Sequence, residues 1–118
     1  MAWKLEADRP IYAQLVEKIQ QQIVTGVYMP GEKIPPVREL AAEASVNPNT
    51  MQKALAELER MGLLFSQRTS GRFVTEDEAA IRGIREELAA VQVKKFLEAM
   101  SELGFDLEAT IALLQEKD

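Results

Sequence analysis

The segment VNPNTMQKAL, residues 46–55, combines a helix start with an unusual run of uncharged polar side chains. Asn47 is a favoured N-cap residue, and Pro48 fits the first helical position because its missing N–H costs nothing there. An apolar stripe with helical spacing then continues to Gly62, which ends the predicted helix. The stripe consists of Met51, Ala54, Leu55, Leu58 and Met61, and the exposed face of the first two turns consists of Asn49, Gln52, Lys53 and Ala56.

Two further helices are predicted upstream of this segment. Apolar residues with helical spacing predict one helix over residues 10–25, and Gly26 follows it where a C-terminal glycine is favoured. Pro35 and Pro36 exclude a helix interior, but Pro36 can begin a helix. A short amphipathic helix is therefore predicted from the repeat at i, i+3, i+4 and i+7 of Val37, Leu40, Ala41 and Ala44.

A hairpin and two more helices are predicted downstream. The β-prone runs 63–67 and 72–75 flank a Ser-Gly turn, and a long helix from Glu76 to Gly104 precedes a short helix capped by Asp106. This order is typical of a winged helix-turn-helix protein. We therefore predict a mainly α fold with a small β-hairpin. A winged helix-turn-helix DNA-binding domain occupies residues 1–75, and a two-helix C-terminal dimerisation appendage occupies residues 76–118.

The two C-terminal helices carry more apolar surface than one small hairpin can bury. Such a surface predicts an interface with another molecule, which we expect to be a second copy of the chain. The predicted dimerisation residues are Ile84, Leu88, Val91, Phe96, Leu97, Met100, Leu103, Leu107, Ile111 and Leu114.

Composition excludes several classes of function. The sequence has no cysteine and no histidine, which excludes disulfides, thiolate metal sites, the usual zinc ligand sets and histidine acid–base catalysis. It also lacks a phosphate-binding glycine loop and a convincing pair of catalytic carboxylates. We expect a protein that is not an enzyme and has no metal and no cofactor. No stretch approaches the roughly 18 apolar residues of a membrane span, so we expect a soluble cytoplasmic protein with no membrane partner.

The acidic residues are concentrated in the C-terminal third of the chain. The net charge is −5, but residues 1–75 carry nine Lys or Arg against eight Asp or Glu, a net charge of +1. Residues 76–118 carry five against eleven, a net charge of −6. The overall acidity therefore does not exclude a nucleic-acid partner for the N-terminal domain.

The polar residues at the start of the third helix suit contact with DNA. The second helix of a helix-turn-helix pair offers its N-terminal residues to base edges in the major groove. The amides of Asn49 and Gln52 can pair with adenine, and each good pair contributes about 1–3 kcal/mol of discrimination. Lys53 suits a phosphate or a guanine, whereas carboxylates at these positions would repel phosphate. A solvated helix surface is the alternative interpretation of these residues.

Five motifs occur in a specific order along residues 10–75. They are PIYAQL at 10–15, GVYMPGEKIP at 26–35, VRELA at 37–41, VNPNT at 46–50 and GRFV at 71–74. Together they resemble the DNA-binding domain of GntR-type bacterial transcription regulators. The two C-terminal helices resemble the short YtrA-type subfamily, whose members dimerise through this region.

The resemblance implies roles for residues in the family's contact positions. Arg38 matches an arginine that contacts phosphate and bases, Thr50 matches a phosphate-binding position, and Gly71 matches a wing-tip glycine near the minor groove. The family usually has serine, glycine and threonine at Pro36, Thr69 and Arg72. The predicted DNA-binding residues are Arg38, Asn47, Asn49, Thr50, Gln52, Lys53, Arg68, Ser70, Gly71 and Arg72, with Asn47 acting mainly as the helix cap.

These features predict a sequence-specific transcription regulator, a repressor, that binds a palindromic operator on double-stranded DNA as a homodimer. The subfamily resemblance implies control of a transporter operon. The residues after residue 75 are too few to enclose a small-molecule effector within one subunit, so an effector pocket would have to form between dimer mates or between domains. The alternative function is a winged-helix protein-interaction module whose acidic helical tail binds the partner.

Overall fold

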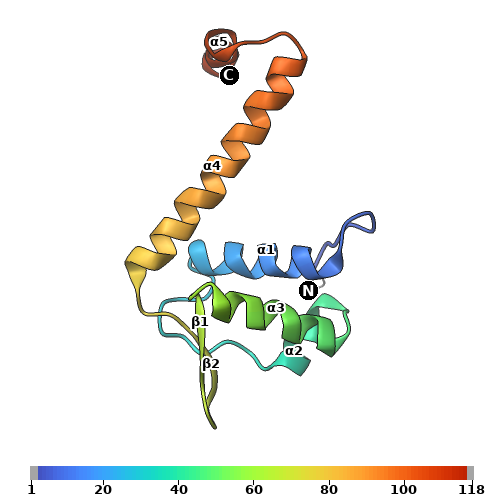
Figure 1. The fold of residues 1–118 in the computed structure, drawn as a ribbon, viewed down its shortest axis with the longest axis vertical. Helices are drawn as coiled ribbons and strands as arrows, with labels where there is room; N and C mark the ends of the chain where they lie inside the picture. Colours follow the sequence, from blue (N-terminus) through green and yellow to red (C-terminus); the bar gives the residue numbers. More distant parts are fainter. Residues whose placement is uncertain (1–2, 117–118) are drawn as a thin grey trace. The chain divides into compact units, whose positions relative to one another are not determined.

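The computed structural model describes residues 3–116, which divide into one unit that ends at Gly83 and another that begins at Ile84. The elements are α1 (Ile11–Val24), α2 (Val37–Ala44), α3 (Pro48–Arg60), β1 (Leu64–Gln67), β2 (Gly71–Val74), α4 (Glu78–Glu102) and α5 (Leu107–Gln115) (Figure 1). The first unit extends past the predicted boundary at residue 75 into α4. Residues 1, 2, 117 and 118 of the predicted domains lie outside the described residues. The division into a DNA-binding and a dimerisation region stays a prediction.

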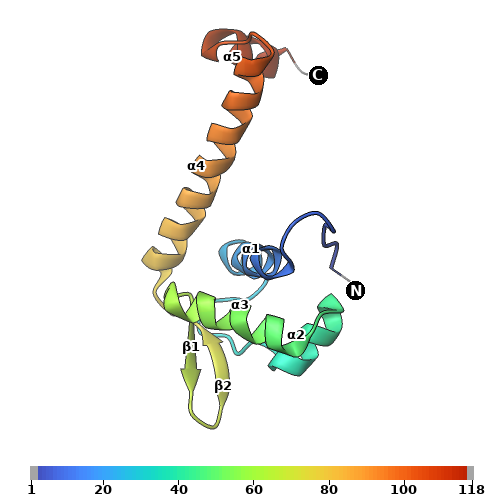
Figure 2. The same cartoon turned by 45° about the vertical axis from the view of Figure 1, so that its right-hand side comes forward.

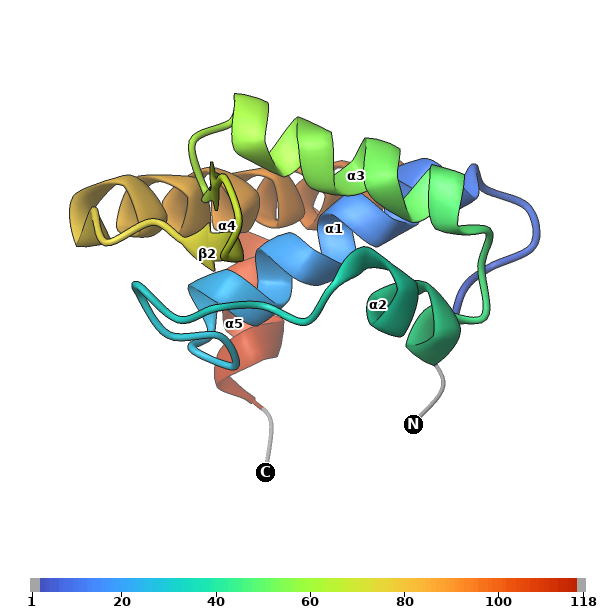
Figure 3. The same cartoon turned by 90° about the horizontal axis from the view of Figure 1, so that it is seen from below.

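The helices of the first unit form where their apolar stripes and end signals predict them. α1 and α3 lie side by side, and α2 packs against the N-terminal part of α3 (Figure 1, Figure 3). The hairpin begins close to the C-terminal end of α3 (Figure 2). This arrangement confirms the predicted mainly α, winged helix-turn-helix fold.

One hydrophobic core joins the helices of the first unit to the hairpin. Each aliphatic side chain buried there contributes about 1.5–3 kcal/mol relative to an exposed one. The fully buried side chains include Leu15, Ile19, Leu40, Met51, Leu55, Leu58, Leu63 and Val74. Because the apolar stripes of α2 and α3 both face this core, the polar face of α3 is left at the surface.

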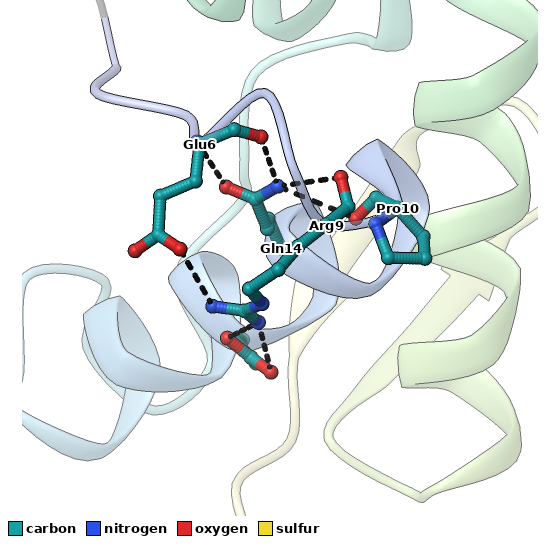
Figure 4. Close-up of polar contacts among 5 residues, drawn as sticks. Glu6, Arg9, Pro10 and Gln14 are labelled. Carbon is teal, nitrogen blue, oxygen red and sulfur yellow. Dashed lines mark hydrogen bonds and ion pairs between the residues drawn. The ribbon is translucent and has the colours of Figure 1, made fainter.

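A buried amide ties the segment before α1 to that helix. Gln14 accepts a hydrogen bond from the Glu6 N–H at 2.6 Å and donates one to the Glu6 carbonyl at 2.7 Å (Figure 4). It also donates to the Arg9 carbonyl at 3.0 Å. Gln14 is only 6% exposed. These bonds therefore satisfy a polar group that would be costly to bury without partners.

Replacing Gln14 with alanine is expected to lower the free energy of unfolding by about 1–3 kcal/mol, because the N–H and the carbonyl of Glu6 both lose their hydrogen bond to this side chain. Urea unfolding followed by circular dichroism measures this change. Gln21→Ala is the matched control, since Gln21 is exposed on the same helix. The control should change the free energy by less than about 0.5 kcal/mol. An equal, small effect of both substitutions would show that the amide does not hold the segment.

The hairpin is anchored at its base and exposed toward its turn. Leu64 pairs with Val74 across the two strands, and both side chains are buried. Residues 65–71 are all exposed. We call residues 64–74 the wing and residues 68–70 its tip. The core thus fixes only the base of the wing.

The second unit contains most of α4 and all of α5. Asp106 caps α5 by accepting a hydrogen bond from the Ala109 N–H at 2.9 Å, which confirms the predicted cap. No described residue of α4 is buried within the single chain. The exposed large apolar side chains of the second unit are Val91, Val93, Phe96, Leu103, Leu107, Ile111, Leu113 and Leu114, of which Leu103 directly follows α4. Within residues 3–116, no helix combines the length and the apolar character needed to span a membrane.

Candidate nucleic-acid interface

The start of α3 presents polar side chains to solvent. The Asn47 side chain accepts a hydrogen bond from the Asn49 N–H at 2.7 Å, which confirms Asn47 as the N-cap. Asn49, Gln52 and Lys53 are exposed, and Thr50 is half-buried. The first two turns of α3 therefore offer amide groups and one cation to a partner.

α2 leads into α3 through a sharp turn. Pro36 precedes α2 without a side-chain cap, as expected for a residue with no hydroxyl. Ser45 ends the helix with a φ of 58°, a left-handed conformation that redirects the chain within three residues. Arg38 is exposed in the first turn of α2. Arg38 and the polar face of α3 therefore belong to the same helix-turn-helix pair.

A cavity of about 510 Å³ lies between the wing, the segment before α2 and the second turn of α3. We call it the wing groove, and residues 33–37, Gln52 and residues 66–72 line it. The fold thereby brings together five of the predicted DNA-binding residues, namely Gln52, Arg68, Ser70, Gly71 and Arg72.

The other predicted DNA-binding residues lie elsewhere on the first unit. Asn47 and Thr50 line a second cavity beside the segment before α1. Lys53 lies in a shallow hollow on α3, while Arg38 and Asn49 are exposed on α2 and α3. The predicted residues therefore form an extended surface rather than a single pocket. Contacts along a duplex, with phosphates on both sides of a groove, need such a surface.

Lys33 is a further cation of the wing groove, outside the set of predicted DNA-binding residues. It forms an isolated β-bridge with Phe73. Its side chain passes close to Gly71, because a Cβ atom on Gly71 would lie 3.1 Å from the Lys33 Cε. Gly71 also has a φ of +106°, which other residues rarely adopt. Lys33 belongs to the GVYMPGEKIP motif, but nothing local in the sequence marks it as a DNA contact, since only folding brings it to the wing.

Ion pairing divides the cations of the first unit into two groups. Arg9, Arg60 and Arg72 each pair with a glutamate. Phosphate is attracted most strongly by cations that no carboxylate neutralises. Within the described part of the chain, no ion pair involves Lys33, Arg38, Lys53 or Arg68.

Arg72 is a predicted DNA-binding residue whose guanidinium has its partner within the protein. Its Nε donates to Glu59 Oε2 at 2.5 Å, and Ser66 Oγ donates to the same oxygen at 2.8 Å. Burial raises the pKa of Glu59, but the hydrogen bonds from Arg72 and Ser66 and the charge of Arg72 outweigh it and hold the pKa below its ordinary value. Glu59 is therefore ionised at neutral pH.

Comparison with known proteins gives a matching family and a related repressor. Residues 11–74 match the family described as bacterial regulatory proteins, gntR family. The chain is 33% identical over 114 residues to the HTH-type transcriptional repressor YtrA of Bacillus subtilis (strain 168). The similarity covers 84% of this chain and 88% of YtrA.

Solved structures share the fold. A GntR family transcriptional regulator from Listeria monocytogenes matches with a TM-score of 0.90 and 38% identity, covering 97% of this chain and 100% of that one. AraR(DBD) in complex with operator ORX1 matches with a TM-score of 0.58 and 33% identity, covering 64% of this chain and 95% of that one. These similarities agree with the predicted family and with a DNA-binding regulator rather than an enzyme.

Proposed function

Because this chain belongs to the gntR family of bacterial regulatory proteins, it is a DNA-binding transcription regulator, and we propose that it represses transcription as a homodimer on a palindromic operator. One observation carries the proposal. The exposed polar start of α3 adjoins the wing groove, Lys33 and Arg68 line that groove, and Arg38 and Lys53 are exposed on α2 and α3. None of these four cations forms an ion pair within residues 3–116. Repression is proposed because YtrA, which is similar over most of this chain, is a repressor.

Asn49 and Gln52 are the proposed base readers. Both are exposed on the first two turns of α3, and their amides can form paired hydrogen bonds with adenine in the major groove. Thr50 and Lys53 are the proposed phosphate contacts of α3, and Arg38 of α2 contacts phosphate and bases. Phosphate contacts fix the register in which the base readers meet the duplex.

The wing supplies a second set of proposed contacts. Gly71 and Ser70 allow the backbone near the tip to approach the minor groove, and Arg68 offers its guanidinium to phosphate. Lys33 joins this set because its side chain lies beside Gly71. The structure favours a different role for Arg72, since Glu59 already neutralises it.

Dimerisation is proposed through the two helices of the second unit. All ten predicted dimerisation residues are at least partly exposed within the chain. Leu103 is 72% exposed and Leu107 is 58% exposed. Many large apolar side chains exposed on a small protein are typical of an interface. Two copies related by a twofold axis would read two half-sites, which multiplies the discrimination of a single α3.

The similarity to YtrA also supports proposals about biological context. We propose a cytoplasmic regulator of a transporter operon, in line with the resemblance to the YtrA-type subfamily. A small-molecule effector would bind between dimer mates, where apolar surfaces of two copies meet.

Selection of duplexes from a random DNA pool by the full-length protein tests the proposed function. We expect enrichment of a sequence with two inverted half-sites, because a symmetric dimer reads both strands alike. Enrichment of a single unrepeated half-site would overturn the homodimer on a palindrome. Absence of any DNA binding at low salt would instead favour the protein-interaction module, with the acidic second unit as its partner-binding face.

Replacing Asn47 with aspartate separates its role as a cap from its proximity to DNA. A carboxylate caps a helix as well as an amide does and is favoured by the helix dipole. We therefore expect the free energy of unfolding to stay within about 0.5 kcal/mol of the wild-type value. Affinity for a mixed-sequence duplex should fall by about tenfold at low salt, because the added charge repels phosphate.

Thermal unfolding and fluorescence anisotropy measure these two quantities. Asn47→Ser is the matched control, because it keeps a capping oxygen without adding charge. If aspartate and serine change the affinity equally, Asn47 does not lie near phosphate.

A further inference from the structure

Glu59 joins the last turn of α3 to the wing. Ser66 and Arg72 form one antiparallel pair, and only the pair of Gln67 with Gly71 lies between it and the tip. Ser66 Oγ and Arg72 Nε donate to the same oxygen of Glu59, at 2.8 and 2.5 Å. One carboxylate thus binds both strands of the wing to α3. We call these three residues the Glu59 clamp.

The clamp lies where the wing loses its apolar anchors. A two-stranded hairpin is marginally stable on its own, and the buried pair of Leu64 with Val74 holds only its base. Alternate residues of a strand share a face, so Ser66 and Arg72 continue the face that starts with this buried pair. The clamp therefore holds the outer part of the wing against α3 from the side chains of this pair, while the Ile34 N–H donates to the Arg72 carbonyl at 3.0 Å.

The positive charge of Arg72 is already neutralised within the protein by Glu59. Its side chain is 17% exposed and is paired with Glu59, whereas Arg68 at the tip forms no ion pair in residues 3–116. A phosphate that drew Arg72 away would leave an ionised, partly buried carboxylate without its partner, which is unfavourable. As a neutral pair, Arg72 and Glu59 also contribute little to counterion release on DNA binding.

We propose that Arg72 is a positioning residue, which orients the wing on α3 through Glu59 and does not itself bind DNA. This inference rests on the proposed interface, in which the tip of the wing contacts the duplex. Arg68 and Lys33 supply the direct contacts of the wing, and the clamp determines whether they reach the phosphates.

Substituting the two charged members of the clamp separates direct phosphate binding by Arg72 from positioning of the wing. The two roles predict opposite results for Glu59→Ala. Arg72→Gln removes a positive charge and Glu59→Ala removes a negative one. If the clamp positions the wing, each variant weakens binding to the duplex selected from the random pool by about tenfold. The double variant is no weaker than either single one, because both break the same contact. Anisotropy titrations at several salt concentrations measure the affinities.

Direct phosphate binding by Arg72 predicts a different pattern. Arg72→Gln alone would then weaken binding and lower the slope of log affinity against log salt by about 0.9. Glu59→Ala would leave the affinity unchanged or increase it, because it frees the guanidinium. Either that pattern or unchanged affinity in both variants would overturn the proposal.

A charge exchange keeps the test valid if a single variant fails to fold. Glu59→Arg and Arg72→Glu should each weaken binding, and their combination should recover most of the wild-type affinity by re-forming the pair. Failure of the combination to recover, in a protein that thermal unfolding shows to be folded, would also contradict positioning through Glu59.

Arg38→Ala and Arg68→Gln separate this proposal from the proposed interface. If both leave affinity for the selected duplex unchanged, the interface itself is wrong. If they weaken binding while Arg72→Gln and Glu59→Ala do not, only the role of the clamp is wrong.

Discussion

Asn49→Ala and Gln52→Ala are each expected to reduce the preference for the operator over a mixed-sequence duplex by about 10- to 100-fold. Each substitution removes one amide that can form a bidentate contact with a base, worth about 1–3 kcal/mol of discrimination. Affinity for the mixed-sequence duplex should change little, because it rests on phosphate contacts. Competition between the two duplexes, followed by anisotropy, measures the preference.

Lys53→Ala is the matched control on the same face of α3. It should weaken binding to both duplexes alike and lower the salt slope by about 0.9, as expected for one lost phosphate contact. All three residues are exposed, so these substitutions should leave the free energy of unfolding within about 0.5 kcal/mol of wild type. An undiminished operator preference in both alanine variants would show that Asn49 and Gln52 are not the base readers.

Phe96→Glu combined with Ile111→Glu is expected to convert the proposed dimer to a monomer and to weaken operator binding by at least about 100-fold. Both side chains are exposed within the chain, at 43% and 42%, so the single chain has little to lose from the change. At an apolar interface, four added carboxylates per dimer would be desolvated without partners. Light scattering measures the mass, and anisotropy measures the affinity.

Gln92→Glu combined with Gln115→Glu is the matched control for the dimer. It adds the same charge to the same two helices at exposed polar positions. We expect the control to remain a dimer and to keep its operator affinity. A monomeric wild-type protein, or a monomeric variant that binds the operator with wild-type affinity, would contradict dimerisation through the second unit as a requirement for operator binding.

The five helices and the hairpin of residues 3–116 could be predicted because their signals are local. The cap at Asn47 needs only the N–H of Asn49, and the cap at Asp106 needs only that of Ala109. Apolar stripes repeat every three or four residues, so they can also be recognised within short windows of sequence. The predicted domain boundary at residue 75 follows a change of pattern, whereas the first compact unit of the structure continues to Gly83. The boundary at Gly83 depends on packing rather than on a change of pattern.

The sequence predicts the candidate site only in part, because some of its contacts are local and others are not. Exposure of Asn49 and Gln52 follows from their positions opposite the apolar stripe of α3, within one helix. The partners of Lys33 and Arg72 depend on strand register and on how the wing packs, which no local pattern specifies. The sequence therefore predicts Arg72 as a DNA contact but does not reveal its pairing with Glu59.

The sequence by itself determined which segments become helices and strands, and which side chains α3 turns away from its own apolar stripe. Helical spacing, caps and turn residues act over a few neighbouring positions, so the order of residues is sufficient. Only the tertiary structure decided that Glu59 holds the wing through Ser66 and Arg72, and that Lys33 lies against Gly71. These contacts join residues from different elements, whose distances are fixed only when the core of the first unit packs α3 against the base of the wing.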